Sequence, residues 1–288
     1  MRHPLGICLA GGGARGIAHI GVLQALEEHG IVPEAISGSS MGAIVGALYA
    51  AGHSPQEMLT ILEESSLLKL FKISLPTLGL TDNTYIIELL QKYIPEDDFS
   101  ALQKTLFVCV TNLSSGRTEM IHEGPLSEIV AASASIPILF NTKQIGKDQY
   151  VDGGLLNNLP VEPLKATCKK VIGVNVTPVA YIEEEVSGLI NLGYRTLDLV
   201  LWANVESRLR QCDVVIEPDT ARFHLFELNK AEAIYQAGYE AAMAELTDLQ
   251  RISRGKKAKT NPYRNRFAET ELSERQGCMG RIKAWFGG

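Results

Sequence analysis

Ser40 lies in the sequence Gly38-Ser39-Ser40-Met41-Gly42, whose G-x-S-x-G pattern is typical of a nucleophilic serine. A short apolar run, residues 35–37, precedes this pattern, and a helix-forming run, residues 41–51, follows it. In such a strand–turn–helix context the serine projects from a sharp turn, which is so crowded that glycine is needed two residues before and after it. The N-terminus of the following helix would favour negative charge on the serine oxygen. We therefore expect Ser40 to be a nucleophile, although a tight structural crossover would show the same pattern.

A second glycine cluster, Gly11-Gly12-Gly13-Ala14-Arg15-Gly16, separates a strand-like run, residues 5–10, from a helix-like run, residues 17–29. Its spacing matches the G-x-G-x-x-G of dinucleotide-binding proteins, which requires an acidic residue at the end of the second strand. In this chain the serine turn occupies that position, and Glu34 stands only at the start of the strand. The exposed N–H groups of the cluster therefore indicate an oxyanion hole. Two roles stay open for Arg15: binding an anionic head group, or a local cap or ion pair.

The group that would activate Ser40 is less obvious. None of the six histidines lies in a distinctive setting (His3, His19, His29, His53, His122 and His224). A hydrolase triad could use Ser40, Asp152 and His224 in that order, but its fold places several strands before the nucleophile. Here only one strand precedes the strand of the serine turn. Asp152 is the better candidate, because a short strand ends at it and Gly153 and Gly154 follow, although the spacing alone favours a plain turn.

The segments 11–16, 38–42 and 152–154, taken in this order, resemble the three signature blocks of the patatin-like phospholipases. Residues 132–137, 157–161 and 212–218 are also similar to the small bacterial members, so that the resemblance covers residues 5 to 250. It implies an α/β class: a three-layer fold with a central, mainly parallel sheet flanked by helices. It also implies a Ser–Asp dyad without histidine, in which Ser40 is the nucleophile and Asp152 its base. The implied oxyanion hole comprises the N–H groups of Gly11, Gly12, Gly13 and Met41.

The resemblance further implies a lipid acyl hydrolase that cleaves phospholipids or lysophospholipids through an acyl-Ser40 intermediate. An acyltransferase of the same mechanism, a non-catalytic scaffold and a nucleotide-dependent oxidoreductase remain as alternatives. A carboxylate is a weak base towards a serine hydroxyl, so we expect burial to raise the pKa of Asp152. Asn141 follows Phe140, where many relatives have proline, and this departure concerns only the shape of a loop.

The intervening sequence alternates short apolar runs with helical runs, as a single α/β domain requires. Strands are predicted at residues 105–110, 118–122, 149–151, 171–176 and 214–217, and helices at 55–64, 85–93, 126–132, 183–211 and 230–249. Five cysteines without C-x-x-C spacing indicate reduced thiols. We expect no metal, no cofactor and no nucleic-acid partner. The apolar run at 5–10 is too short for a signal peptide, and we expect a cytoplasmic protein.

Two segments differ from the rest of the chain. Residues 65–83 combine large apolar side chains with Pro76 and Gly79, which favours a rim or lid for an acyl chain over ordinary core. Residues 251–288 contain ten Lys or Arg and three Glu, in a chain whose net charge is −6. We expect this basic tail to be either disordered or in peripheral contact with an anionic membrane, with Trp285 in the headgroup layer.

Overall fold

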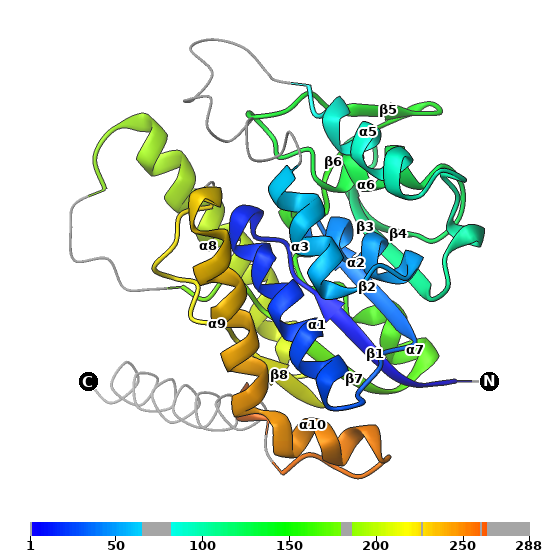
Figure 1. Cartoon of the computed structure of the whole chain (residues 1–288). Helices are drawn as coiled ribbons and strands as arrows, with labels where there is room; N and C mark the ends of the chain where they lie inside the picture. The colour runs from blue at the N-terminus through cyan, green and yellow to red at the C-terminus, as the bar shows by residue number, and fades with distance from the viewer. Residues whose placement is uncertain (1, 65–81, 180–185, 226, 260, 264–288) are drawn as a thin grey trace, which may run out of the picture.

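The computed structural model describes residues 2–64, 82–179, 186–225, 227–259 and 261–263, and shows a mixed sheet between helices (Figure 1). In these residues eight strands form one sheet, in the order β5-β6-β3-β2-β1-β7-β8 with β4 paired to β3. The strands are β1 (His3–Leu9), β2 (Ala35–Ser39), β3 (Thr105–Asn112), β4 (Arg117–Ile121), β5 (Lys143–Ile145), β6 (Asp148–Asp152), β7 (Cys168–Val174) and β8 (Val214–Ile216).

The middle of the sheet is parallel, as the sequence predicts. β1 pairs in parallel with β2 and β7, and the parallel pairs β2–β3 and β7–β8 extend the sheet on both sides. β4 and β6 pair antiparallel to β3, and β5 pairs antiparallel to β6. A central parallel strand is buried on both faces and is therefore continuously apolar. This is the pattern of β1, where Leu5, Ile7 and Leu9 are buried.

Helices cover both faces of the sheet, which gives the three-layer α/β fold that the resemblance implies. The helices are α1 (Ala18–Glu28), α2 (Met41–Ala51), α3 (Pro55–Glu64), α5 (Thr84–Tyr93), α6 (Leu126–Ser133), α7 (Glu162–Thr167), α8 (Leu189–Leu209), α9 (Ala231–Ala244) and α10 (Leu246–Ser253). In the view of Figure 1, α1, α3 and α9 lie in front of the sheet and α7 lies behind it. α1 packs along α9, and α7 packs against β7, β1 and β2.

Two predicted helices differ from the structure, and one strand was missed. The single helix predicted at 230–249 is two helices, α9 and α10, which meet at Glu245. No glycine or proline marks this break, and α10 turns to pack its own buried face against β1 and β8. The helix predicted from residue 183 begins at Leu189, after Gly188 at φ 81°, and 180–185 lie outside the described residues. Strand β5 was not predicted, because its three residues form a strand only by pairing with β6.

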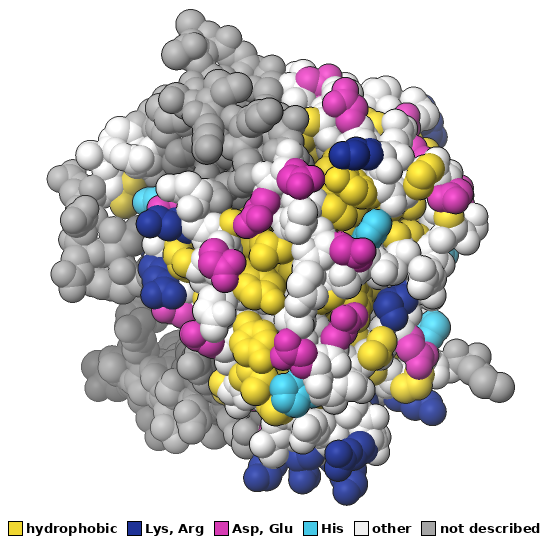
Figure 2. Space-filling model, viewed as in Figure 1, with side chains coloured by type: hydrophobic (Ala, Val, Ile, Leu, Met, Phe, Trp, Pro, Cys, Tyr) yellow, Lys and Arg dark blue, Asp and Glu magenta, His cyan; other side chains and the backbone are white. Residues whose placement is uncertain are grey.

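The C-terminal basic segment begins on the body of the protein. α10 spans the predicted boundary between residues 250 and 251, and beyond this helix Asn261 and Tyr263 are buried. Figure 2 shows Lys and Arg side chains gathered at the lower edge of the viewed face, where Figure 1 places α10. The predicted lid, apart from Asp82 and Asn83, and the tail beyond residue 263 lie outside the described residues. Within the described part of the chain, every helix is too short or too polar to cross a bilayer.

Candidate active site

Ser40 stands at the junction of β2 and α2. Its backbone has φ 52° and ψ −125°, a conformation that residues with a side chain rarely adopt. The Ser40 N–H donates to Ser133 Oγ at 3.0 Å, and Ser133 Oγ donates to the carbonyl oxygen of Cys109 at 2.6 Å. Ser133, at the end of α6, thus links the strained turn to β3. No sequence pattern around Ser133 predicted this role.

Close backbone contacts surround this turn, which explains its two flanking glycines. A Cβ built on Gly42 would lie 2.2 Å from the carbonyl oxygen of Leu9 and 2.7 Å from that of Ala10. A Cβ on Gly38 would lie 2.4 Å from the carbonyl oxygen of Gly42. All three distances are far inside van der Waals contact and involve backbone atoms that cannot move aside alone. α2 therefore begins directly against the end of β1.

Strand β3 brings the ends of β2 and β6 together. Ser39 of β2 pairs with Cys109, and Asp152 of β6 pairs with the next residue of β3, Val110. Because β4 occupies one edge of β3 at these same residues, β2 and β6 share the other edge. Ser40 directly follows Ser39, so strand pairing alone places Ser40 beside Asp152. Ser40 and Asp152 are therefore neighbours in the structure although they are far apart in the sequence.

Burial and hydrogen bonding act on the Asp152 carboxyl group in opposite directions. Asp152 is 5% exposed, and its Oδ1 accepts a 2.7 Å hydrogen bond from the N–H of Gly154 in η3 (Gly153–Leu155). Oδ2 is buried and accepts no hydrogen bond of ordinary geometry from the described residues. Burial raises the pKa of Asp152 to about 6, and it outweighs the lowering by the Ser40 side chain and the Gly154 N–H. The pKa is therefore raised, as expected from the sequence.

The glycine cluster follows β1 and enters the 3-10 helix η1 (Gly13–Ile17). The Gly11 N–H donates to the carbonyl oxygen of Asn158 at 3.2 Å, so it is not available to an oxyanion. The N–H groups of Gly12, Gly13 and Met41 have no acceptor among the described residues. Of the four predicted donors, these three are therefore unpaired in the described part of the chain. Gly16 lies against the side chain of Met41, at the start of α2.

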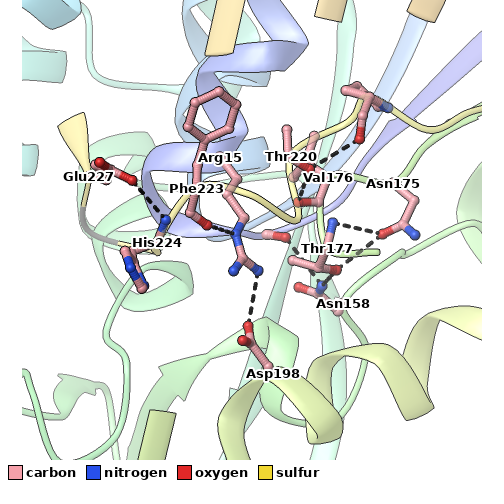
Figure 3. A network of polar contacts seen from close by, with 12 residues as sticks. Arg15, Asn158, Asn175, Val176, Thr177, Asp198, Thr220, Phe223, His224 and Glu227 are labelled. Atoms are coloured by element: carbon pink, nitrogen blue, oxygen red, sulfur yellow. Dashed lines mark hydrogen bonds and ion pairs between the residues drawn. The ribbon is translucent and has the colours of Figure 1, made fainter. Parts of the chain in front are cut away.

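Arg15 forms an ion pair, one of the two roles that the sequence left open, although its partners are distant in the sequence. Its side chain is buried, Nε donates to the carbonyl oxygen of Phe223 at 2.7 Å, and Nη1 lies 3.0 Å from Asp198 Oδ1 (Figure 3). Asp198 belongs to α8, and its neighbour Leu197 faces the pocket beside Ser40. Arg15 thus ties the glycine cluster to α8 and to the loop after β8.

A largely apolar pocket opens at Ser40. It is lined by Gly12, Gly13, Ser40, Ile136, Pro137, Asp152, Leu155, Asn158, Leu197, Leu201 and Leu225. No histidine is among these lining residues. His224 is exposed and His19 is buried, with Nε2 of His19 placed 2.7 Å from the carbonyl oxygen of Ala10. The pocket thus combines a serine and a carboxyl group with free N–H groups and an apolar wall.

The sequence of this chain is similar to one known protein family and to several longer proteins. A family profile described as "Patatin-like phospholipase" matches residues 7–165. An uncharacterized NTE family protein of Mycobacterium tuberculosis is 30% identical over 269 residues, covering 84% of this chain and 46% of that protein. Human patatin-like phospholipase domain-containing protein 6 is 27% identical over 279 residues, and the match covers 84% of this chain and 20% of the human protein. The chain therefore spans less than half the length of these relatives.

Among solved structures, the crystal structure of VipD from Legionella pneumophila aligns with a TM-score of 0.47 at 17% identity. The alignment covers 84% of this chain and 66% of VipD. The ExoU–SpcU complex of Pseudomonas aeruginosa aligns with a TM-score of 0.44 at 18% identity, covering 86% of this chain and 52% of that chain.

Proposed function

The chain belongs to the patatin-like phospholipase family, and on this premise we propose that it hydrolyses carboxylic esters of phospholipids or lysophospholipids through an acyl-Ser40 intermediate. Ser40 is the nucleophile and Asp152 its base. The observation that carries this proposal is a serine in strained backbone geometry beside a buried carboxyl group, in one apolar pocket. Family membership supports lipid ester hydrolysis in general, and the roles of individual residues rest on the geometry.

In the proposed acylation step, Ser40 Oγ attacks the ester carbon while its proton moves to Asp152. The carbonyl oxygen becomes an oxyanion, which the N–H groups of Gly12, Gly13 and Met41 bind. One such donor is typically worth about 10²–10³ in rate. The proton on Asp152 then passes to the departing alcohol as the bond to the acyl carbon breaks. The N-terminus of α2 adds a favourable field at the serine oxygen.

The pocket wall supports an acyl chain as the substrate group nearest Ser40. Its large side chains are aliphatic (Ile136, Leu155, Leu197, Leu201 and Leu225), and apolar clefts bury apolar ligands. No cationic side chain lines the pocket in the described residues, because Arg15 is held by Phe223 and Asp198. The described pocket wall therefore favours specificity for the acyl chain of the substrate over specificity for its head group.

The division of the chain also belongs to this proposal. Residues 5–250 form the catalytic domain, and the basic segment 251–288, whose first part packs on this domain, contacts anionic membrane peripherally on the cytoplasmic side. The exposed Arg254, Lys256 and Lys257 support such a contact electrostatically. Acyl transfer to an alcohol is the second candidate activity, since it shares the acyl-enzyme and differs only in the attacking group.

Covalent labelling with a fluorophosphonate probe tests the proposed nucleophile directly. We expect a single adduct by intact mass, mapped by peptide sequencing to Ser40. The strained turn at residues 38–42, called the elbow below, and the three free N–H groups activate this serine alone. Release of fatty acid from phosphatidylcholine and lysophosphatidylcholine vesicles should be lost in the labelled protein. An adduct on another serine, or no adduct on folded protein, would contradict the proposal.

Substitution of Gly42 tests whether the position of the elbow matters. We expect Gly42→Ala to lower ester hydrolysis by about 10²-fold, since the added Cβ must push α2 away from the Leu9 carbonyl oxygen and misplace Ser40. We also expect a loss of stability of about 1–3 kcal/mol from overpacking, measured by urea unfolding.

Gly46→Ala is the matched control on the same helix. Its Cβ would lie 3.1 Å from Ile36 Cγ2 and 3.2 Å from Leu106 Cδ1, side-chain atoms that can adjust. Activity should stay within about threefold, because side-chain adjustments of this kind are accommodated in cores. Equal losses in the two variants would show that α2 tolerates no added methyl group anywhere, and the elbow argument would then fail.

A further inference from the structure

Asn158 carries a buried carbonyl oxygen that the proposed acylation step does not use. The side chain lines the pocket and is fully buried. Its Oδ1 accepts no hydrogen bond from any of the described residues. Buried polar atoms are nearly always paired in folded proteins, so an unpaired acceptor beside a reactive serine indicates a missing donor.

The hydrogen bonds of the Asn158 Nδ2 group fix the orientation of the side-chain amide. Asn158 Nδ2 donates to the carbonyl oxygen of Gly11 at 3.2 Å and to Thr177 Oγ1 at 3.3 Å. A backbone carbonyl can only accept, so an amide turned over would set two oxygens against each other. Nδ2 is therefore the end of the amide that is paired with Gly11 and Thr177, and Oδ1 is the end left without a donor in the described residues.

A chain of hydrogen bonds behind Asn158 enforces this orientation, and Figure 3 shows the part of it from Asn175 through Thr177 to Asn158. It begins at the carboxylate of Glu217, which accepts from Asn175 Nδ2 at 2.7 Å. Asn175 Oδ1 consequently faces Thr177 and accepts from both its N–H and its Oγ1 at 3.1 Å. Because the hydroxyl proton of Thr177 is used there, its oxygen has only lone pairs to offer to Asn158 Nδ2. The sequence of donors and acceptors leaves Asn158 Oδ1 as the free end.

Two glycines locate this oxygen relative to the dyad. A Cβ on Gly11 would lie 2.5 Å from Asn158 Oδ1 and 3.0 Å from Ser40 Cβ. A Cβ on Gly154 would lie 2.6 Å from the same oxygen and 3.0 Å from Asp152 Oδ1. The acceptor therefore borders Ser40 on one side and Asp152 on the other, and glycine at both positions keeps the space between them free.

We propose that Asn158 Oδ1 orients the water that hydrolyses the acyl-Ser40 intermediate, a role that rests on the proposed function above. The water oxygen bonds to the acyl carbon while one of its protons moves to Asp152 and its other O–H donates to Asn158 Oδ1. When the tetrahedral intermediate collapses, the bond from the acyl carbon to Ser40 Oγ breaks, and the proton on Asp152 returns to Ser40. The free fatty acid carries the second proton away.

Methanol distinguishes this role from a structural one. It has a single hydroxyl proton, which Asp152 takes, so its attack needs no second acceptor. In water–methanol mixtures, the wild-type acyl-enzyme should give free acid and methyl ester in a fixed ratio. We expect Asn158→Leu to raise the proportion of methyl ester to free acid about tenfold, the effect of losing one hydrogen bond to the attacking water. Leucine has the branching of asparagine, so the space open to methanol is not enlarged.

Asn157→Leu serves as the matched control. Asn157 is the neighbouring residue and is also buried, but its Nδ2 donates to Glu162 and its side chain does not line the pocket. The product ratio should be that of wild type. Thr177→Val, which removes the acceptor behind Asn158 without altering the pocket, should raise the ratio by a smaller factor.

The ratio is measured per acyl-enzyme formed, so partial unfolding of a variant does not change it. An unchanged ratio in Asn158→Leu, with both products falling together, would overturn the role of Asn158 and leave the acyl-enzyme standing. Absence of both products and of a trapped acyl-enzyme in the wild-type protein would instead overturn the proposed function, and this role with it.

Discussion

Replacing Ser40 by alanine is expected to lower ester hydrolysis by about 10⁴-fold or more, with little change in stability. The substitution removes the attacking oxygen but leaves the free N–H groups of Gly12, Gly13 and Met41, which retain a small part of the catalysis. Alanine can adopt this strained backbone conformation as well as serine can, and the backbone N–H at this position still donates to Ser133 Oγ. The measurement is kcat/KM on a short-chain nitrophenyl ester and on lysophosphatidylcholine, with urea unfolding of the same preparations.

Ser39→Ala is the control that the elbow itself offers. Ser39 precedes Ser40 and is fully buried, and its Oγ has no hydrogen-bond partner among the described residues. Removing an unpaired buried hydroxyl is close to neutral for stability, and activity should stay within about threefold of wild type. If Ser39→Ala and Ser40→Ala lost activity equally, the reaction would depend on the shape of the turn, and Ser40 would not be the nucleophile.

Much of the fold was predictable because its signals are local. The run of apolar residues in β1, the helix after the Ser40 turn and the short strand ending at Asp152 each follow from a few neighbouring residues. The central, mainly parallel sheet was predicted from the family resemblance, whereas the order of its strands was not predicted. The break at Glu245 was not predictable, since it depends on where α10 finds a surface to cover, and its sequence continues a helical pattern.

The site could be predicted only in part for a related reason. The spacing of its glycine-rich turn predicts Ser40 as a nucleophile, whereas the role of Asp152 was predicted from the family resemblance, because its spacing alone favours a plain turn. Arg15 and Asn158 act through contacts with residues distant in the chain, Asp198 and Thr177, and no spacing reveals such partners. The Asn157-Asn158 pair that follows the Asp-Gly-Gly turn was the available signal, but it does not say which of the two asparagines faces the pocket.

Asp152→Asn is expected to lower ester hydrolysis by about 10³-fold, because the amide cannot accept the proton of Ser40. The amide oxygen can still accept the hydrogen bond from the Gly154 N–H, so the geometry of the turn should be kept. In the wild-type protein, activity should rise with pH through about 6, the pKa of Asp152, since only the carboxylate acts as a base. This pH dependence should be absent from the residual activity of the variant.

The same substitution is expected to stabilise the fold at neutral pH. Asp152 has a pKa of about 6 when folded and an ordinary value of 3.8, so between these values the unfolded chain binds fewer protons and stability falls as pH rises. Above about pH 6 the folded protein bears the full cost of a buried carboxylate, at most about 3 kcal/mol for a shift of roughly two pKa units. The neutral amide of the Asp152→Asn variant would bear none of this cost.

Urea unfolding of wild type and Asp152→Asn near pH 4 and near pH 8 measures this difference. The variant should gain stability relative to wild type between the two conditions, by about 2–3 kcal/mol, while remaining the less active protein throughout. A stability difference between the variant and wild type that is the same at both pH values would exclude a base with a raised pKa. Opposite changes in activity and stability would show that the carboxylate is kept in an unfavourable place because the reaction requires it there.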